Sequence, residues 1–438
     1  SRSFAAPPAS GSRNMAAESE PLLLAVVGAG PVGLELALGA AQRGLRVEVF
    51  ERAPACAGTV ESWQHVRLFS DWSLNMGEAG RVALASHGQL PAEGDFPTGR
   101  EFVDSYLMPL ASSLKEHPNC RGVHFGTEVL AVGRGSLLKG ESINGGDLKM
   151  PKDNPHCKSQ RASTPFRLLV REGETERYAS GFDVVVDCSG SYGRRELGNW
   201  VGNGGVPAIG ERSLRQNGRI WATVPDVLGA DRARFAGRRT LVVGAGYSAA
   251  TTVSFLLELV GSETGTSVAW ATRRGGEPYE VLEEDPLPAR KRLCQLGNQV
   301  VSGALQGVDY IRGAVVSALA PSSNGRLRVE LEVHGRQKPQ VEEVDELVAC
   351  VGYRPDSSLH QELQVHQCYA TDGPIKLAAT LLGASGDCLK QSAAGVETLK
   401  NPEPGFFILG SKSYGRSSAF LLKIGYSQAK EVLDAVAP

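Results

Sequence analysis

The chain of 438 residues is 42% hydrophobic and 21% charged, and its formal net charge is −2. These values are typical of an ordinary soluble globular protein with two or three domains, and the near balance of charge argues against nucleic acid as the main partner. Eight cysteines are scattered without a CxxC pair or zinc-site spacing, so we expect reduced thiols and no metal site. The apolar stretch 22–41 contains Glu35, Pro31 and four glycines, and we therefore expect no membrane span.

Residues 1–20 are rich in Ala, Ser and Pro and carry no acidic residue before Glu18. This composition predicts a disordered tail. A transit-peptide remnant, a cloning remnant and a plain disordered segment all fit it. We expect a cytoplasmic protein, with an organelle as the alternative if the tail is a transit-peptide remnant.

The stretch 22–51 carries the fingerprint of a dinucleotide-binding unit. An apolar run predicts a strand, and it is followed by the glycine turn 28–33, a helix to about residue 43 and a second strand over 45–50. The glycines allow a tight turn, close approach to a pyrophosphate and packing of the helix on the strand, while the helix N-terminus offers N–H groups to phosphates. An acidic residue after the second strand would accept hydrogen bonds from ribose. The cofactor-binding residues expected here are Gly28, Gly30, Pro31, Val32, Gly33, Glu51 and Arg52.

The next stretch, 52–77, lacks periodicity but is rich in aromatic and polar residues, which often line a site on irregular segments. Arg67 and, further on, Val129 are expected beside the cofactor. A helix is predicted over 98–114, with Thr98 as its cap and Glu101 three positions later. Residues 123–132 predict strand structure, and the Gly-, Lys- and Ser-rich residues 133–164 predict a mobile surface loop.

A hairpin is predicted over 166–179, and a buried strand over 182–187. Residues 191–236 contain no long predicted element, and we interpret them as a linker that packs between domains. The pattern then repeats, with a strand over 239–243, a second glycine turn, a helix to about Val260 and a strand over 267–271. The third glycine is replaced by Ala249, which the fingerprint tolerates.

The second unit ends in Arg273 and Arg274, where the first has Glu51. Because arginine suits a 2′-phosphate, the first unit is predicted to bind FAD and the second NADPH. A solvated basic turn is the alternative for this pair. The cofactor-binding residues expected in the second unit are Gly244, Gly246, Tyr247, Ser248, Arg273 and Arg274.

Strands are predicted at 308–318, 326–334 and 346–351, and the C-terminal part predicts a strand over 406–409, a polar turn over 410–416 and a helix to Val436 capped by Ser417 or Ser418. The fold class is therefore α/β with two Rossmann-like dinucleotide-binding domains. We expect the FAD domain over 21–236 and 346–438, with the NADPH domain over 237–345 inserted in it. Further contacts to the flavin are expected from the small residues at strand ends, namely Cys188, Ser189, Gly190, Gly352, Gly410 and Ser411.

Five motifs resemble those of the flavoproteins with two dinucleotide-binding domains, a group that includes flavin-containing monooxygenases, N-hydroxylases, Baeyer–Villiger enzymes and thioredoxin-reductase-like proteins. The motifs are GAGPVG, GAGYSA, DCSG, VACVGYRPD and FFILG, and together they span about residues 22–436. The pattern HVRLFS…NPEPGFF…KSYGR is also similar to that of poorly characterised bacterial flavoproteins, some placed near arsenic resistance. Three departures are evident, because the histidine-containing signature of the flavin-containing monooxygenases is missing, the CxxC pair of thioredoxin reductases is missing, and Ser411 replaces an aspartate.

The resemblance implies a monooxygenase in which NADPH reduces FAD and the reduced flavin oxygenates a small molecule at nitrogen, sulfur or arsenic through a C4a-hydroperoxide. Asn75, Ser70 and Trp72 are the candidates beside the reacting atoms, with a turn-capping Asn75 and a core Trp72 as the alternatives. The partners expected are a small-molecule substrate and dioxygen, and homo-oligomerisation stays open.

The alternative function is a reductase that relays electrons by thiol–disulfide exchange through Cys188 and Cys350, unless these cysteines merely fill small slots at strand ends. Lys412, Tyr414 and Arg416 lie near the expected flavin, where they would bind an anionic substrate, stabilise an anionic flavin or make phosphate and backbone contacts.

Overall fold

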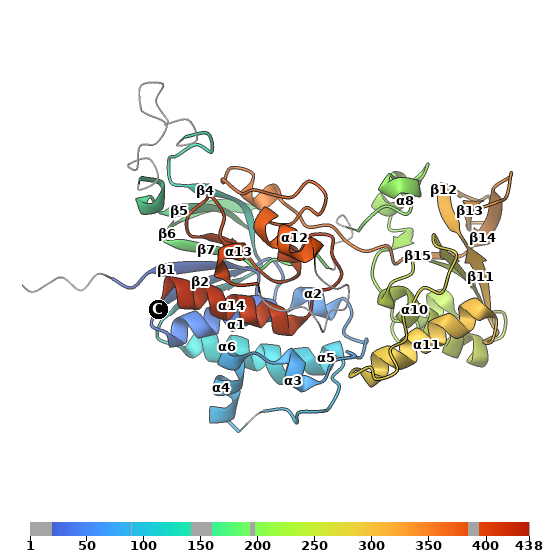
Figure 1. The fold of residues 1–438 in the computed structure, drawn as a ribbon, viewed down its shortest axis with the longest axis horizontal. Coiled ribbons are helices and arrows are strands. Elements are labelled where there is room, and N and C mark those ends of the chain that lie inside the picture. Colours follow the sequence, from blue (N-terminus) through green and yellow to red (C-terminus); the bar gives the residue numbers. More distant parts are fainter. Residues whose placement is uncertain (1–19, 89, 142–159, 193–197, 384–393, 438) are drawn as a thin grey trace, which may run out of the picture.

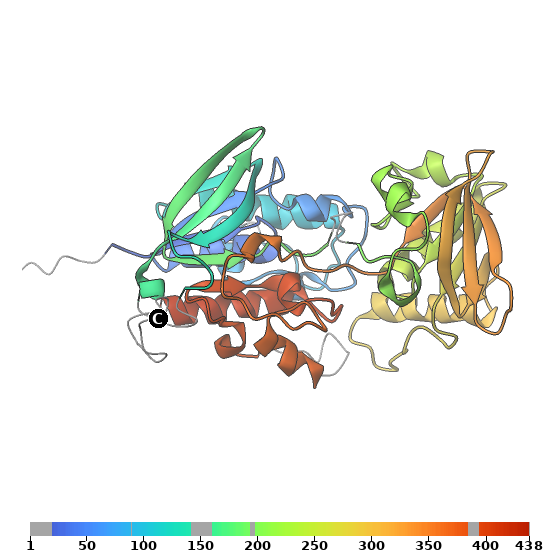
Figure 2. The same ribbon diagram turned by 90° about the horizontal axis from the view of Figure 1, so that it is seen from above.

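The computed structural model describes residues 20–88, 90–141, 160–192, 198–383 and 394–437. Residues 1–19 of the predicted tail and the middle of the predicted 133–164 loop lie outside these ranges. The chain forms two domains that lie side by side, and it crosses between them after β7 (Val184–Asp187) and again after β15 (Glu346–Ala349) (Figures 1 and 2).

The first domain is built on a five-stranded parallel sheet in the order β16-β7-β1-β2-β3. Its strands are nearly continuous apolar runs, because both faces are covered. Helices α1, α4, α6 and α14 pack together on one side (Figure 1). Besides β7, the sheet and these helices comprise β1 (Leu23–Val27), β2 (Arg46–Glu51), β3 (Cys120–Phe125), β16 (Phe406–Ile408), α1 (Pro31–Gln42), α4 (Glu78–Ser86), α6 (Met108–Glu116) and α14 (Leu422–Val436).

The second domain repeats this architecture with a parallel sheet in the order β11-β10-β9-β15-β8. In the first domain a three-stranded antiparallel sheet follows the third strand of the parallel sheet and precedes the fourth, and in the second domain such a sheet lies between the fourth strand, β11, and the fifth, β15. The second-domain elements are β8 (Ile220–Trp221), β9 (Arg239–Val243), β10 (Ser267–Thr272), β11 (Val308–Arg312), α10 (Tyr247–Ser262) and α11 (Pro288–Ser302). The antiparallel strands are β4 (Thr127–Arg134), β5 (Phe166–Glu172) and β6 (Thr175–Phe182) in the first domain, and β12 (Ala314–Pro321), β13 (Leu327–Val333) and β14 (Gln340–Val344) in the second.

The remaining described helices are short. Thr98 caps α5 in a reciprocal capping box with Glu101, as predicted, and the helix continues through a π-helical segment, Val103–Leu107, into α6. These short helices are α2 (Gly58–Glu61), α3 (Trp72–Asn75), α5 (Gly99–Phe102), α8 (Glu211–Gln216), α9 (Arg232–Phe235), α12 (Ile375–Leu382) and α13 (Val396–Leu399).

Three details differ from the sequence prediction. The single strand predicted over 308–318 is two strands in different sheets, because Gly313 takes a φ of +63° and turns the chain between them. The final helix begins at Leu422, and its N-cap is Leu421 without a side-chain hydrogen bond, so neither predicted serine caps it. Within the predicted linker 191–236, β8 pairs with β15 and Leu214 lies in the core of the second domain.

The division at residues 236 and 345 stays a prediction. Strands on the outer side of each of these boundaries, β8 and β15, both pair in the second parallel sheet.

Candidate functional site

The two predicted glycine turns have the same hydrogen-bonding pattern. The amide of Gly28 donates to Phe50 O at 2.8 Å, and the amide of Gly244 donates to Ala271 O at 3.0 Å. Each turn also lies against the end of a neighbouring strand. There the backbone amide of Cys188 donates to Val27 O, and the backbone amide of Cys350 donates to Val243 O. The internal repeat seen in the sequence is therefore a repeat of backbone geometry.

Glycine is required at the first position of each turn. Gly28 has a φ of +100°, and a Cβ there would lie 2.8 Å from Cys188 O. Gly244 has a φ of +129°, and a Cβ there would lie 2.1 Å from Cys350 O. Gly33 has a different constraint, since its Cβ would lie 2.0 Å from Gly28 O, which matches its predicted role in packing α1 on the turn.

Each turn leads into a helix whose N-terminus has no side-chain cap. Gly30 is the N-cap of α1, with Pro31 at the first helical position, and Gly246 is the N-cap of α10. A Cβ on either glycine would meet nothing within 4 Å, so open space lies in front of both helix ends. The uncapped N–H groups and the positive end of the helix dipole fit a pyrophosphate at each place.

Glu51 closes the first turn. Its Oε2 accepts the amide of Ala29 at 2.7 Å, and its Oε1 accepts the amide of Ala53 at 2.8 Å. Each carboxylate oxygen keeps a further lone pair for a ribose hydroxyl. Beyond it, Arg52, Glu128 and Arg171 line a smaller cavity of about 490 Å³. This end of the site has the polar character that an adenosine ribose needs.

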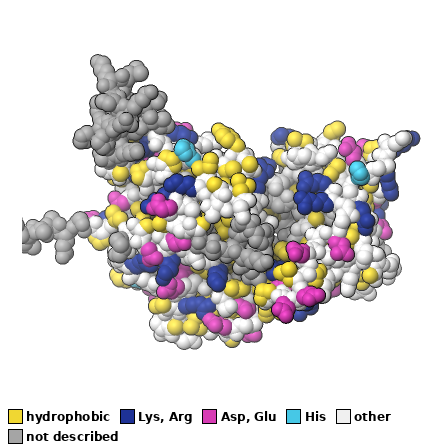
Figure 3. All heavy atoms as spheres, viewed as in Figure 1, with side chains coloured by type: hydrophobic (Ala, Val, Ile, Leu, Met, Phe, Trp, Pro, Cys, Tyr) yellow, Lys and Arg dark blue, Asp and Glu magenta, His cyan; other side chains and the backbone are white. Residues whose placement is uncertain are grey.

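A cavity of about 1240 Å³ joins the two glycine turns and extends between the domains. Figure 3 shows the two domains as lobes separated by a notch at the upper edge of the molecule. Most of the residues predicted from the sequence line this cavity. They are Gly28, Gly30, Pro31, Val32, Glu51, Arg52, Arg67, Ser70, Asn75, Val129, Cys188, Ser189, Gly190, Gly246, Tyr247, Ser248, Gly352, Gly410 and Ser411.

Five of the residues predicted from the sequence do not line the large cavity. Gly33 and Gly244 act through backbone packing behind the turns. Trp72 is 5% exposed and packs in the core against Phe102 and Tyr106, with ring centroids 6.0 and 6.5 Å away. Trp72 therefore belongs to the core, and its predicted place beside the reacting atoms is wrong.

Arg273 and Arg274 also lie outside the cavity lining. Both are exposed and directly follow β10, at the carboxyl end of the second parallel sheet. Within the described ranges, no ion pair or side-chain hydrogen bond occupies either guanidinium group. Their role as a 2′-phosphate site stays a prediction.

Asn75 lines the cavity, but its amide group is engaged locally. Asn75 Nδ2 donates to the carbonyl oxygens of Ser70 and Asp71, both at 2.8 Å, and Ser70 Oγ donates to Asn75 Oδ1 at 3.0 Å. Tyr426 of α14 donates to the backbone carbonyl of Asn75 at 2.8 Å. Because both amide protons are taken, the side chain of Asn75 holds the loop in shape and could only accept a further hydrogen bond.

The two strand-end cysteines lie in environments that suppress thiolate formation. Burial, together with the charge of Asp187, raises the pKa of the Cys188 thiol well above its usual value. Burial raises the pKa of the Cys350 thiol to about 12, although Thr252 Oγ1 lies 3.7 Å from its sulfur. Thiol–disulfide exchange needs a thiolate, so neither cysteine is set up as a nucleophile near neutral pH.

A buried ion pair that the sequence did not predict lies beneath the first turn. Lys412 Nζ donates to Asp187 Oδ2 at 2.6 Å and to Ser189 Oγ at 3.0 Å. Ser189 in turn donates its amide and its hydroxyl to Asp187 Oδ1. Burial opposes ionisation of Asp187, but Lys412 and His360 outweigh it and hold its pKa well below the usual range.

The pairing of Lys412 corrects one expectation. Its charge is neutralised by Asp187, and the charge of Arg416 is neutralised by Asp372, so neither is a free cation for an anionic substrate. Tyr414, which was also expected to contact an anionic substrate or the flavin, is buried.

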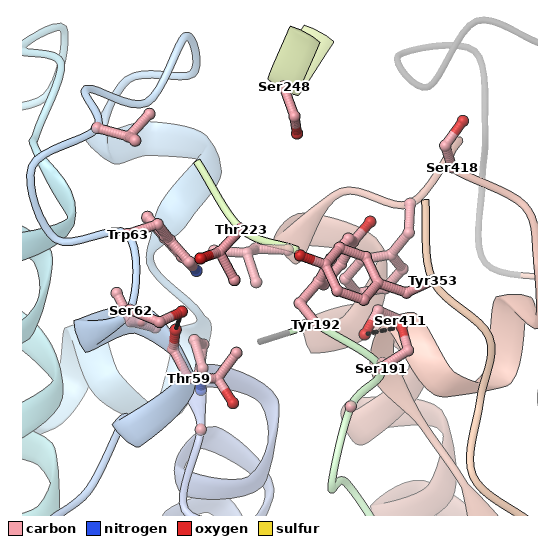
Figure 4. A pocket seen from close by; sticks show the side chains of 18 of the residues that line it. Thr59, Ser62, Trp63, Ser191, Tyr192, Thr223, Ser248, Tyr353, Ser411 and Ser418 are labelled. Atoms are coloured by element: carbon pink, nitrogen blue, oxygen red, sulfur yellow. Dashed lines mark hydrogen bonds between the residues drawn. The ribbon is translucent and has the colours of Figure 1, made fainter. Parts of the chain in front are cut away.

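Further cavity residues were not named as site residues from the sequence, although Thr59, Ser62 and Trp63 lie in the irregular stretch 52–77 that was expected to line a site (Figure 4). They surround a space between the α2 region on one side and the strand ends of the first domain on the other. Several of the others follow a glycine turn or a strand end in the sequence. The residues are Thr59, Ser62, Trp63, Ser191, Tyr192, Thr223, Tyr353 and Ser418.

Comparison with known protein families supports the interpretation of the first turn. The model for the NAD(P)-binding Rossmann-like domain matches residues 26–83. No curated protein matches the sequence.

Solved structures resemble the chain over nearly its whole length. Bacillithiol disulfide reductase Bdr (YpdA) from Bacillus cereus has a TM-score of 0.63 at 17% identity, over 95% of this chain and 99% of its own. Ornithine N-hydroxylase KtzI from Kutzneria sp. 744, solved with reduced FAD, NADP+ and L-ornithine, has a TM-score of 0.59 at 17% identity, over 94% and 98%. Thioredoxin reductase from T. acidophilum has a TM-score of 0.54 at 14% identity, over 94% and 97%.

The chain has the fold of a flavoprotein with two dinucleotide-binding domains. This fold is shared by disulfide reductases and N-hydroxylases. No helix in the described part of the chain has both the length and the apolar character needed to cross a bilayer. Among the described residues, no group of three His, Cys, Asp or Glu side chains could hold a metal ion.

Proposed function

We propose that the protein is an oxidoreductase that binds FAD on the first glycine turn and NADPH on the second, and that it oxygenates a small molecule at a soft heteroatom (nitrogen, sulfur or arsenic) with dioxygen as the oxidant. Bound FAD would supply hydride acceptance from NADPH and reactivity with oxygen. The chain's own residues bind both dinucleotides, orient them and enclose the space between them.

The observation that carries the proposal is the continuous cavity between the two turns. Gly30 at one helix N-terminus and Gly246 at the other both line it, as do the strand-end residues Cys188 and Cys350. Two dinucleotides held by these helix ends would extend into one shared cavity, which is the condition for hydride transfer between them.

The alternative is a reductase that passes electrons through Cys188 and Cys350. The raised pKa of both thiols argues against it, because a thiol with a pKa of about 12 is almost wholly protonated at neutral pH. The sequence also contains no CxxC pair. These observations favour an acceptor that is not a cysteine of the chain, and dioxygen is the acceptor that we propose.

The proposal is tested with the purified protein loaded with FAD. NADPH should reduce the flavin under anaerobic conditions, and NADPH oxidation in air should consume dioxygen in equal amount. A panel of probes (thioanisole, L-ornithine, cadaverine and arsenite) is then supplied with ¹⁸O₂, and products are analysed by mass spectrometry. Incorporation of one labelled oxygen into a probe supports the proposal, whereas complete recovery of the electrons as hydrogen peroxide with every probe counts against it.

The reductase alternative has its own test. Cys188→Ala and Cys350→Ala variants should retain bound FAD and NADPH oxidation within about a factor of three of the wild type, since these thiols are not thiolates. If either variant keeps its FAD but loses NADPH oxidation, the sulfur mechanism is favoured instead. Iodoacetamide labelling provides an independent readout, because Cys368, whose pKa is lowered by hydrogen bonds from Thr371 and neighbouring backbone, should react before either of them.

A further inference from the structure

The middle of the cavity is walled by hydroxyl and aromatic side chains. Figure 4 shows Thr59 and Trp63 facing Tyr192 and Tyr353 across the space, with Thr223 between them and Ser248 above. We name this part the central chamber. Tyr192 and Tyr353 meet edge to face with ring centroids 5.4 Å apart, so one wall is an aromatic corner.

The charged residues of the cavity can each be accounted for. Among the described residues, nine that line the cavity are charged, and three of them, Glu51, Arg52 and Glu128, also line the smaller cavity at the ribose end. Thr59 of the chamber wall also lines this smaller cavity, so these three charged residues adjoin the chamber on that side. Their charges serve the adenosine part of a dinucleotide.

Four others are satisfied by partners in the protein. Asp285 and Arg290 pair with each other at 2.8 Å, with both side chains 4% exposed. Lys412 pairs with Asp187, as described above. Asp356 accepts the amide of Ser358 at 2.9 Å. None of these groups is offered to a ligand as an unpaired charge.

The last two charged residues are exposed. Arg67 lies 3.5 Å from Glu101 and also donates to the carbonyl of Phe96, and its side chain is 59% exposed. Glu280 is exposed on the second domain. High-dielectric solvent around both groups weakens their attraction for a molecule inside the chamber.

A charged molecule entering the central chamber would therefore lose its hydration without meeting, among the residues that the structure describes, a buried counter-ion that is still unpaired. Loss of hydration by an unpaired ion costs several kcal/mol, whereas a neutral molecule with an apolar or aromatic body carries no such cost. Hydroxyl groups can donate or accept, so they suit neutral heteroatoms. Within the described residues, the side chains of Thr59, Thr223 and Ser248 have no hydrogen-bond partner in the protein.

We infer that the central chamber binds an electrically neutral molecule with an aromatic or apolar body and one heteroatom, and rejects ammonium and carboxylate groups. The inference rests on the proposed function, since it concerns the substrate of that same site. It separates this protein from the ornithine N-hydroxylase of the same fold, whose structure contains the charged amino acid L-ornithine.

The test uses three probes that share one scaffold and differ in charge: thioanisole, 4-(methylthio)benzylamine and 4-(methylthio)benzoate. Each is titrated into the oxidised, FAD-loaded protein without NADPH, and binding is followed by the flavin absorbance and by calorimetry. Thioanisole should bind at least about tenfold more tightly than either charged analogue. Equal or tighter binding of a charged analogue, or no binding of thioanisole, would overturn the inference.

A charge placed in the chamber provides the second arm. Thr223→Asp should raise affinity for 4-(methylthio)benzylamine relative to thioanisole by about tenfold or more, because it supplies the missing counter-ion. Thr175→Asp, at the exposed start of β6, is the matched control and should change nothing. An unchanged order of affinities in Thr223→Asp would remove Thr223 from the wall and overturn the inference. If thioanisole binds but is never oxygenated, the monooxygenase proposal fails while the neutral ligand class stands.

Discussion

Lys412 Nζ lies 2.6 Å from Asp187 Oδ2, where β7 and β16 end side by side beneath the first glycine turn. The two residues are 225 positions apart in the sequence, and their side chains are 3% and 0% exposed. The pair holds together Ser189 on one strand end and the Gly410–Tyr414 turn on the other. The ion pair thereby fixes the positions of these two strand ends, which line the cavity.

Removing one charge of this pair should destabilise the protein strongly. Lys412→Met leaves Asp187 buried without its main counter-ion, and the free energy of unfolding should fall by about 3–5 kcal/mol. Urea unfolding followed by circular dichroism measures this. Lys430→Met, which breaks the exposed Lys430–Glu78 pair, is the matched control and should have little effect. The double variant Asp187→Asn/Lys412→Met should recover part of the loss, and failure to do so would contradict an electrostatic cause.

The same pair predicts a dependence on pH. Because the pKa of Asp187 is held below its usual value, its ionised form stabilises the native state above about pH 4, and this stabilisation is lost as the pH falls through the folded-state pKa. Without Lys412, burial would instead favour the protonated carboxyl group. The difference in unfolding free energy between the wild type and Lys412→Met should therefore narrow as the pH is lowered from 7 to about 3. A difference independent of pH would show that lost packing, and not charge, causes the destabilisation.

Substitutions at the glycines of the two turns should distinguish positions needed for folding from positions needed only for cofactor binding. Gly30→Ala and Gly246→Ala place a methyl group in open space in front of a helix end, so both variants should fold normally. Gly30→Ala should lose FAD, and Gly246→Ala should keep FAD but bind NADPH at least about tenfold more weakly. Flavin absorbance and NADPH titration measure the two effects.

Gly28→Ala and Gly33→Ala are the contrasting variants. An alanine methyl would lie 2.8 Å from Cys188 O in the first and 2.0 Å from Gly28 O in the second, so both should lower the melting temperature even without cofactor. A Gly30→Ala protein that retains full FAD, with unchanged affinity, would contradict the placement of FAD on this turn.

The arginines after β10 should discriminate between nicotinamide cofactors. Replacing Arg273 and Arg274 with Ala removes the expected contacts to a 2′-phosphate, and the KM for NADPH should rise about tenfold to a hundredfold while that for NADH barely changes. Arg177→Ala, on exposed β6 of the other domain, is the control. Equal losses with both cofactors would refute the 2′-phosphate role, and an unchanged KM for both would assign the pair to a solvated turn.

Local patterns in the sequence were sufficient to predict both strand–turn–helix–strand units. A glycine with positive φ, a helix start and an apolar strand are each determined within about ten residues. The positions of Gly28 and Gly244 in the two turns, and of Glu51 at the end of the second strand, could therefore be predicted from the sequence. The strand ends at Cys188 and Cys350 were also placed correctly, because buried strands of a parallel sheet are continuous apolar runs.

Tertiary structure decided the rest. Trp72 and Asn75 carry the same local signal, yet one packs in the core and the other lines the cavity, since the direction of a side chain on an irregular segment depends on what surrounds it. The membership of β8 in the second sheet and the pairing of Lys412 with Asp187 join residues far apart in the chain. The neutral wall of the central chamber likewise comes from five separate segments. Such contacts follow from the order of strands in the sheets and the packing of the two domains, and no local pattern of residues encodes them.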